Sequence, residues 1–91
     1  MCRNIRSLFN FDPPATREEV QLASLQYVRK ISGFQKPSKI NEKVFMDAVN
    51  DVALVSARLL SNLETSAPSK NREIEAAKIR SRTLKRYSQE I

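Results

Sequence analysis

The 91-residue sequence has no histidine and no tryptophan, and it has a single cysteine, Cys2, and a single glycine, Gly33. Without histidine, the chain lacks the imidazole groups that the common zinc sites and the Ser-His-Asp and Cys-His catalytic groups require. With one cysteine, it cannot form an internal disulfide bond. We therefore predict a protein that is not an enzyme, with no catalytic residues, no metal site and no cofactor.

Long apolar runs are also lacking. No segment has the length and hydropathy of a signal peptide or a membrane-spanning helix, so we expect a cytoplasmic protein with no membrane partner. One glycine and four prolines supply too few turn residues for a sheet of several strands. The hydrophobic fraction of 41% and the charged fraction of 29% are ordinary for a globular chain, and the length predicts a single helical domain over residues 1–91.

Cysteine and carboxylate side chains are the remaining candidates for chemistry. Cys2 would lie beside a free α-amino group once Met1 is removed, as in N-terminal nucleophile enzymes, but those enzymes need a much larger fold. We interpret Cys2 as a buried or incidental residue, with a redox or modification role as the alternative. Asp47 and Asp51 lie four residues apart on the polar side of an expected helix, which is typical of solvated charge.

Local signals predict a first helix over residues 17–32. Thr16 and Glu19 have the spacing of a capping box, in which each side chain accepts a hydrogen bond from the other residue's backbone N–H. Gly33 is the residue type that most often ends a helix, because it adopts the left-handed conformation without a steric penalty.

Two further helices are expected over residues 41–63 and 71–89. The second helix follows Ser38 or Asn41 as its N-cap, and its apolar residues keep the i, i+3, i+4, i+7 spacing along its length. The third helix follows Asn71 as its N-cap. Its apolar stripe is narrow and consists of Ile74, Ala77, Leu84 and Ile91.

These elements predict an all-α fold, a small three-helix bundle built on an antiparallel hairpin of the first two helices. Residues 1–15 form an aromatic segment with a short N-terminal turn or helix, which Asp12, Pro13 and Pro14 bring to an end. The residues expected in the hydrophobic core are Ile5, Leu8, Phe9, Val20, Leu25, Val28, Phe45, Val49, Val52 and Leu60.

Positive charge is concentrated near the C-terminus. The chain has a formal charge of +6, and residues 66–91 hold seven Lys and Arg residues against three Glu residues, a net charge of +4. Lys78, Arg82, Lys85 and Arg86 recur at helical spacing and lie on one flank of the third helix. This flank is the leading candidate for contacts to nucleic-acid phosphates, and the alternative is an ordinary solvated helix face.

A second basic cluster lies in the connection between the first two helices. Lys36 and Lys39 flank Pro37 and Ser38, and the functional interpretation is a phosphate held by Ser38 and Lys39 at the start of the second helix. The alternative interpretation is helix capping, with the Phe34 side chain buried in the core.

The predicted function is a non-enzymatic interaction module whose basic surface binds nucleic acid or another acidic partner, such as an acidic protein. The alternative is a structural or protein–protein interaction module, in which the third helix completes its apolar stripe against another chain or against a second copy in a homo-oligomer. Salt distinguishes the two, because contacts to phosphates weaken steeply with salt and an apolar helix interface does not.

Two stretches of the sequence resemble a known family. The residues that carry the resemblance are Cys2, Arg3, Asn4 and Ile5, then Arg29, Lys30, Ile31, Ser32, Gly33, Pro37, Ser38 and Lys39. They resemble the prokaryotic family defined as domain of unknown function 2277, and the resemblance covers nearly the whole chain. It implies a helical domain of bacterial or archaeal source. Because that family has no established activity, the resemblance implies no functional residues.

A second resemblance is to the helical hairpin of a J-domain. The residues that carry it are Leu8, Pro14, Ala15, Thr16, Glu18, Glu19, Val20 and Phe45. J-domains stimulate heat-shock ATPases through a His-Pro-Asp tripeptide in the loop between their hairpin helices. The corresponding loop here contains Gln35, Lys36, Pro37 and Ser38. The resemblance therefore implies a J-domain-like fold without cochaperone activity.

Overall fold

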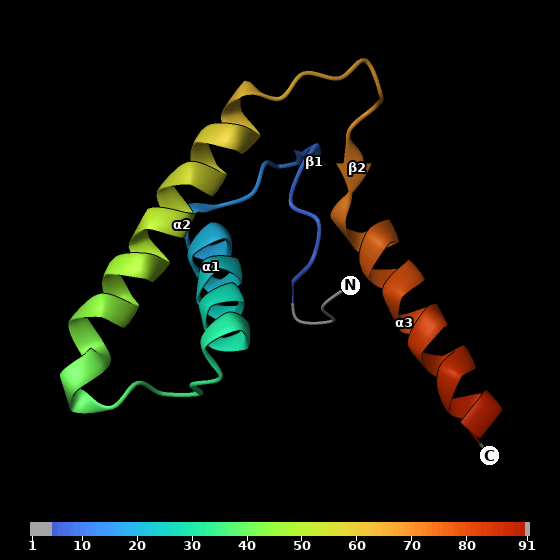
Figure 1. Cartoon of the computed structure of the whole chain (residues 1–91). Coiled ribbons are helices and arrows are strands. Elements are labelled where there is room, and N and C mark those ends of the chain that lie inside the picture. The colour runs from blue at the N-terminus through green and yellow to red at the C-terminus, as the bar shows by residue number, and fades with distance from the viewer. Residues whose placement is uncertain (1–4, 91) are drawn as a thin grey trace. The chain divides into compact units, whose positions relative to one another are not determined.

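A computed structural model of the chain describes the backbone of residues 5–90 and the side chains of residues 5–86 (Figure 1). Three α-helices dominate it: α1 (Arg17–Ser32), α2 (Glu42–Asn62) and α3 (Arg72–Glu90). A 3-10 helix, η1 (Lys39–Asn41), precedes α2. The prediction of a small, mostly α-helical fold with three helices is confirmed, and each helix begins and ends within one residue of the expected position.

The described chain divides into two compact units. The hairpin unit contains the described residues up to Phe9 together with Ala15–Glu64, and so includes α1 and α2. The strand–helix unit contains Asn10–Pro14 and the chain from Thr65 onward, which includes α3. The single domain over residues 1–91 stays a prediction.

The ends of α1 have the predicted capping structures. The Thr16 hydroxyl oxygen accepts a hydrogen bond from the Glu19 backbone N–H at 3.2 Å, and the Glu19 carboxylate accepts one from the Thr16 N–H at 2.9 Å. Gly33 has a φ of 76°, and its N–H donates to the Arg29 carbonyl at 2.9 Å. The capping box and the glycine stop are therefore confirmed.

The predicted cap of α2 is wrong. Asn41 precedes the helix, but neither its side chain nor that of Ser38 accepts a hydrogen bond from the first turn. The Asn41 amide instead donates to the Ser38 hydroxyl at 2.9 Å, and the Asn41 backbone N–H donates to the Ser38 carbonyl. The chain enters α2 through η1, whose tight turn bonds already use these groups.

The core of the hairpin unit lies between α1 and α2, which run side by side in opposite directions (Figure 1). α1 contributes side chains spaced four residues apart, and so does α2, because residues four apart share a helix face. Val49 is 1% exposed. The buried side chains are Val20, Ser24 and Val28 from α1, and Phe45, Val49 and Ala53 from α2.

The predicted core is confirmed only in part. Four of its members, Val20, Val28, Phe45 and Val49, are buried. The other six are only half-buried: Ile5, Leu8, Phe9, Leu25, Val52 and Leu60.

Three side chains in the hairpin unit differ from the expectation. Phe34, expected to be buried in the core, is 40% exposed. Ser24 and Ala53, which were not expected, are buried. Ser24 tolerates burial because its hydroxyl donates to the Val20 carbonyl at 2.8 Å.

Residues 5–8 have no regular secondary structure, and the chain turns at Phe9 and Asn10. In the strand–helix unit, strand β1 (Phe11–Asp12) then pairs in parallel with strand β2 (Lys70–Asn71), an element that the sequence did not predict. Asn10 has a φ of 66°, and its side-chain amide donates to the Pro68 carbonyl at 3.1 Å. The left-handed backbone of Asn10 and its side-chain hydrogen bond to Pro68 therefore place β1 beside a segment nearly sixty residues further along the chain.

The N-cap of α3 is as predicted, because the Asn71 side-chain oxygen accepts hydrogen bonds from the N–H groups of Glu73 and Ile74 at 2.9 and 3.1 Å. The predicted apolar stripe is not the covered side of the helix. Ile74 is 57% exposed and Leu84 is 66% exposed, whereas Ala76 and Ile79 are half-buried. Ile91 lies outside the described residues.

Candidate functional site

The predicted basic flank lies on α3 and faces solvent. Lys78, Arg82, Lys85 and Arg86 are all exposed. Their spacing places them within about 100° of arc around the helix axis, at 100° per residue. Arg80, also exposed, lies on the opposite side of the helix. The structure thus brings four cationic side chains of one helix together on a single accessible flank.

Only the first residue of this flank has an acidic neighbour among the ion pairs of the described residues. The Lys78 ammonium lies 3.4 Å from a carboxylate oxygen of Glu75, and both side chains are partly exposed. From Lys78 to Arg86 the sequence contains no acidic residue. An anion that approaches the flank therefore meets a stretch of α3 in which positive charge predominates.

The second predicted cluster, Lys36 and Lys39, is exposed but belongs to the hairpin unit. Lys43, one turn further along, is paired: its ammonium donates to the Asp47 carboxylate at 2.7 Å, and this hydrogen bond raises the pKa of Lys43. The Ser38 hydroxyl accepts a hydrogen bond from Asn41, as described above. The structure therefore shows two exposed lysines, Lys36 before η1 and Lys39 at its first residue. The Ser38 side chain makes no capping hydrogen bond there.

A cation–aromatic cluster in the strand–helix unit was missed from the sequence. The Lys70 ammonium and the Arg72 guanidinium lie 5.4 and 5.3 Å from the centroid of the Phe11 ring. The Arg72 Nε also donates to the Pro13 carbonyl at 3.0 Å. Strand pairing brings these residues together from distant parts of the sequence, so no local pattern predicts the cluster. The cluster joins the N-terminal segment to the start of α3.

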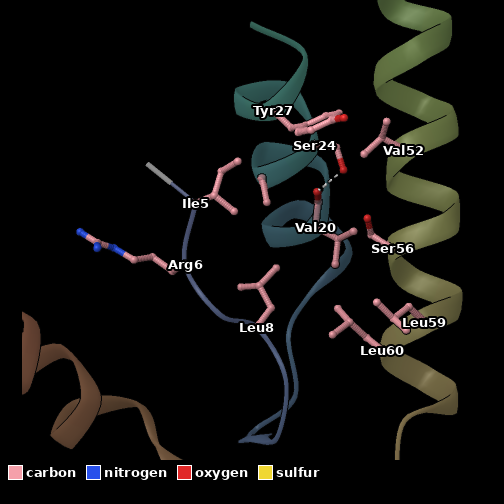
Figure 2. Close-up of a pocket in the computed structure, with 11 residues that line it drawn as sticks. Ile5, Arg6, Leu8, Val20, Ser24, Tyr27, Val52, Ser56, Leu59 and Leu60 are labelled. Atoms are coloured by element: carbon pink, nitrogen blue, oxygen red, sulfur yellow. Dashed lines mark hydrogen bonds between the residues drawn. The ribbon is translucent and has the colours of Figure 1, made fainter. Parts of the chain in front are cut away.

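An apolar groove of about 380 Å³ runs along one side of the hairpin unit (Figure 2). Figure 2 shows Ile5 and Leu8 of the N-terminal segment on one wall, with α1 and α2 forming the rest, while the Arg6 side chain points away. The groove has few polar groups. Its lining residues are Ile5, Arg6, Leu8, Val20, Ala23, Ser24, Tyr27, Val52, Ser56, Leu59 and Leu60.

Three hydroxyl groups, from Ser24, Tyr27 and Ser56, are the polar groups in this groove besides Arg6. The Ser24 hydroxyl is occupied by its hydrogen bond to Val20. Hydroxyls without a neighbouring base do not supply acid–base chemistry, so the groove is suited to apolar contact.

In residues 5–90, no helix combines the length and hydropathy needed to cross a bilayer. Among residues 5–86, whose side chains are described, no cluster of three or more potential metal ligands is present. Asp47 and Asp51 are exposed, and Asp47 is engaged by Lys43. Cys2 lies outside the described residues.

Comparison with known proteins identifies one family. Its model, described as "Uncharacterized conserved protein (DUF2277)", matches residues 1–78. No curated protein and no solved structure matches the chain, so the J-domain resemblance has no support from a solved structure. The matched region includes the whole groove and the Phe11 cluster, and ends at Lys78, the first residue of the basic flank. The chain belongs to this family of uncharacterized conserved proteins.

Proposed function

We propose that this protein is a non-enzymatic interaction module that binds nucleic acid through the basic flank of α3. The observation that carries the proposal is the accessibility of Lys78, Arg82, Lys85 and Arg86 on one side of a helix, in a stretch without acidic residues. Lys and Arg side chains arranged in this way neutralise phosphates and release the counterions condensed on a nucleic acid.

Binding of this kind reads the phosphate backbone and not the bases. The flank has no amide side chain between its cations that would read adenine, and no aromatic side chain there that would stack on unpaired bases. We therefore expect little preference among DNA sequences, and a high sensitivity to salt.

The experiment is a salt titration of binding to a labelled 20-base-pair DNA duplex, followed by fluorescence anisotropy from about 50 to 200 mM salt. The expected result is a dissociation constant that rises steeply with salt and is similar for two unrelated DNA sequences. Absence of binding at about 50 mM salt, where such contacts are strongest, contradicts the proposal.

Lys36 and Lys39 are a second candidate contact of the same kind, on the hairpin unit. Their contribution is measured separately with a double Lys36→Gln, Lys39→Gln variant. A contact to phosphate lowers the salt slope of this variant by up to about two units, since each phosphate contact contributes close to one. An unchanged slope assigns binding to α3 alone.

The second candidate function is protein–protein association through helices. It is favoured by the exposure of Ile74 and Leu84, two large apolar side chains of α3. An exposed apolar stripe on a surface helix is typical of an interface with another chain. Association by this route is nearly independent of salt, and the titration above distinguishes it from phosphate binding.

A further inference from the structure

The apolar groove of the hairpin unit is one end of a longer apolar face. On α1, Ala23 and Tyr27 line the groove, and Ile31 follows four residues later on the same side of the helix. On α2, the apolar residues recur at intervals of three and four, which is the spacing of a helix packed along a partner helix. We call this surface the hairpin face; it consists of Ile5, Leu8, Ala23, Tyr27, Ile31, Val44, Ala48, Val52, Val55 and Leu59.

Five large side chains of the hairpin face are substantially exposed, at 44% for Tyr27, 66% for Ile31, 72% for Val44, 54% for Val55 and 56% for Leu59. Arg6 lines the groove end of the face, but its side chain points away from the groove (Figure 2), and the residues of the face itself are uncharged. Lys30 and Asp51, at the margins of the face on α1 and α2, have opposite charges. Burial of the apolar side chains removes no charge from water while Lys30 and Asp51 stay at the rim.

The opposite side of the hairpin differs in this respect. A smaller groove there includes Arg17, and a hydrogen bond of 3.1 Å from Gln21 to Asn50 connects the two helices across it. The Gln21 and Asn50 side chains are already hydrogen-bonded to each other, and the Arg17 guanidinium needs contact with water. The hairpin face is thus the side on which exposed apolar surface is continuous along both helices.

The area of the hairpin face matches what a small dimer interface needs. A whole apolar side chain of this size presents roughly 100 Å², so the five exposed side chains present on the order of 300 Å². The half-buried members of the face add to this value. The smallest specific interfaces bury about 600 Å² on each partner, of which a little more than half is apolar.

We propose that a second copy of this chain occupies the hairpin face, and that the two hairpins form a four-helix arrangement about a twofold axis. A twofold axis along the helices places α1 of each copy against α2 of the other, so that every apolar stripe meets an apolar stripe. The face has the features that such self-association requires: two antiparallel helices of about 24 and 31 Å, apolar stripes on both, and no charge between them. Because the area is near the lower limit of specific interfaces, we expect a weak and transient dimer.

The test is sedimentation equilibrium of the full chain between about 5 and 500 µM, a range chosen for a weak dimer, after nuclease treatment and at two salt concentrations. The wild type is expected to change from monomer to dimer over this range at both salt concentrations. Nuclease treatment makes the test independent of nucleic-acid binding, so the failure of one proposal is distinguishable from the failure of the other.

Val55→Glu is the diagnostic variant, because a twofold interface buries the new charge twice. Its dissociation constant should rise at least about tenfold. Leu54→Glu is the matched control: Leu54 is the neighbouring residue on α2, is 67% exposed and lies away from the hairpin face, so dimerisation should change less than about twofold. Far-ultraviolet circular dichroism and thermal melting establish that both variants remain folded.

Ile31→Glu, on the other helix, provides a second variant if Val55→Glu does not fold. A wild type that stays monomeric throughout the concentration range overturns the proposal. So does a dimer that survives both Val55→Glu and Ile31→Glu, or that is lost in Leu54→Glu alone, because the contact then lies on another surface.

Discussion

The Arg72 guanidinium lies over the ring of Phe11, 5.3 Å from its centroid, although sixty-one positions separate the two residues in the sequence. Lys70 lies at a similar distance from the same ring. This contact and the pairing of β1 with β2 connect the N-terminal segment to the start of α3 within the strand–helix unit.

Phe11→Leu removes both cation–aromatic contacts while keeping an apolar side chain. We expect the variant to lose about 1–2 kcal/mol of stability in the strand–helix unit, because each such contact at an exposed site contributes about 0.5–1 kcal/mol. Amide hydrogen exchange at the start of α3 measures the change. The control is Phe34→Leu, at an exposed phenylalanine, which should leave this exchange unaltered. Equal effects of the two substitutions would show that the cluster does not stabilise α3.

Phe45→Ala removes the largest side chain of the hairpin core. Phe45 is 6% exposed, and truncation of a buried phenylalanine costs about 3–5 kcal/mol, a large share of the stability of a small domain. We expect the variant to be largely unfolded in urea denaturation experiments. Met46→Ala, at the adjacent residue that is 44% exposed, is the matched control and should cost less than about 1 kcal/mol. Similar midpoints for the two variants would contradict the packing of α2.

Thr16→Ala should lower the stability of α1 by about 1 kcal/mol, because it leaves the Glu19 N–H without its capping hydroxyl. Asn41→Ala tests the opposite finding at α2. Since the Asn41 side chain bonds to Ser38 and not to the first turn of the helix, we expect a loss of no more than about 0.5 kcal/mol. Chemical denaturation measures both values. A larger loss at Asn41 than at Thr16 would reverse the assignment of caps.

Replacing Lys78, Arg82 and Lys85 together by glutamine removes three charges from the basic flank. If these residues contact phosphates, the salt slope of DNA binding should fall by up to about three units while the melting temperature stays nearly constant, since exposed charges contribute little to stability. The control is Arg80→Gln, on the opposite side of α3, which should leave the slope nearly unchanged. Equal losses per charge in both variants would indicate binding by net charge and not by this flank.

The helices could be predicted from sequence because their boundaries depend on neighbouring residues. Thr16 and Glu19 lie within one turn of each other, Gly33 ends α1 by its own backbone freedom, and Asn71 caps the helix that follows it directly. The exposed flank of Lys78 to Arg86 was predictable for the same reason, since the period of a helix determines which side chains share a side. The prediction of an N-cap for α2 was wrong because the side chains of Ser38 and Asn41 form a hydrogen bond with each other.

The tertiary structure decided which side chains are buried and which distant segments pair. Ser24 is buried because α2 covers it and its hydroxyl is satisfied by Val20, which no hydrophobic pattern shows. Ile74 and Leu84 are exposed, although they belong to the apolar stripe predicted for the third helix. The β1–β2 pair and the Phe11 cluster depend on contacts between residues far apart in the chain. The sequence by itself therefore determined the helices and their charged flank, through interactions within a few residues, whereas the core, the groove and the anchoring of α3 were decided by long-range packing.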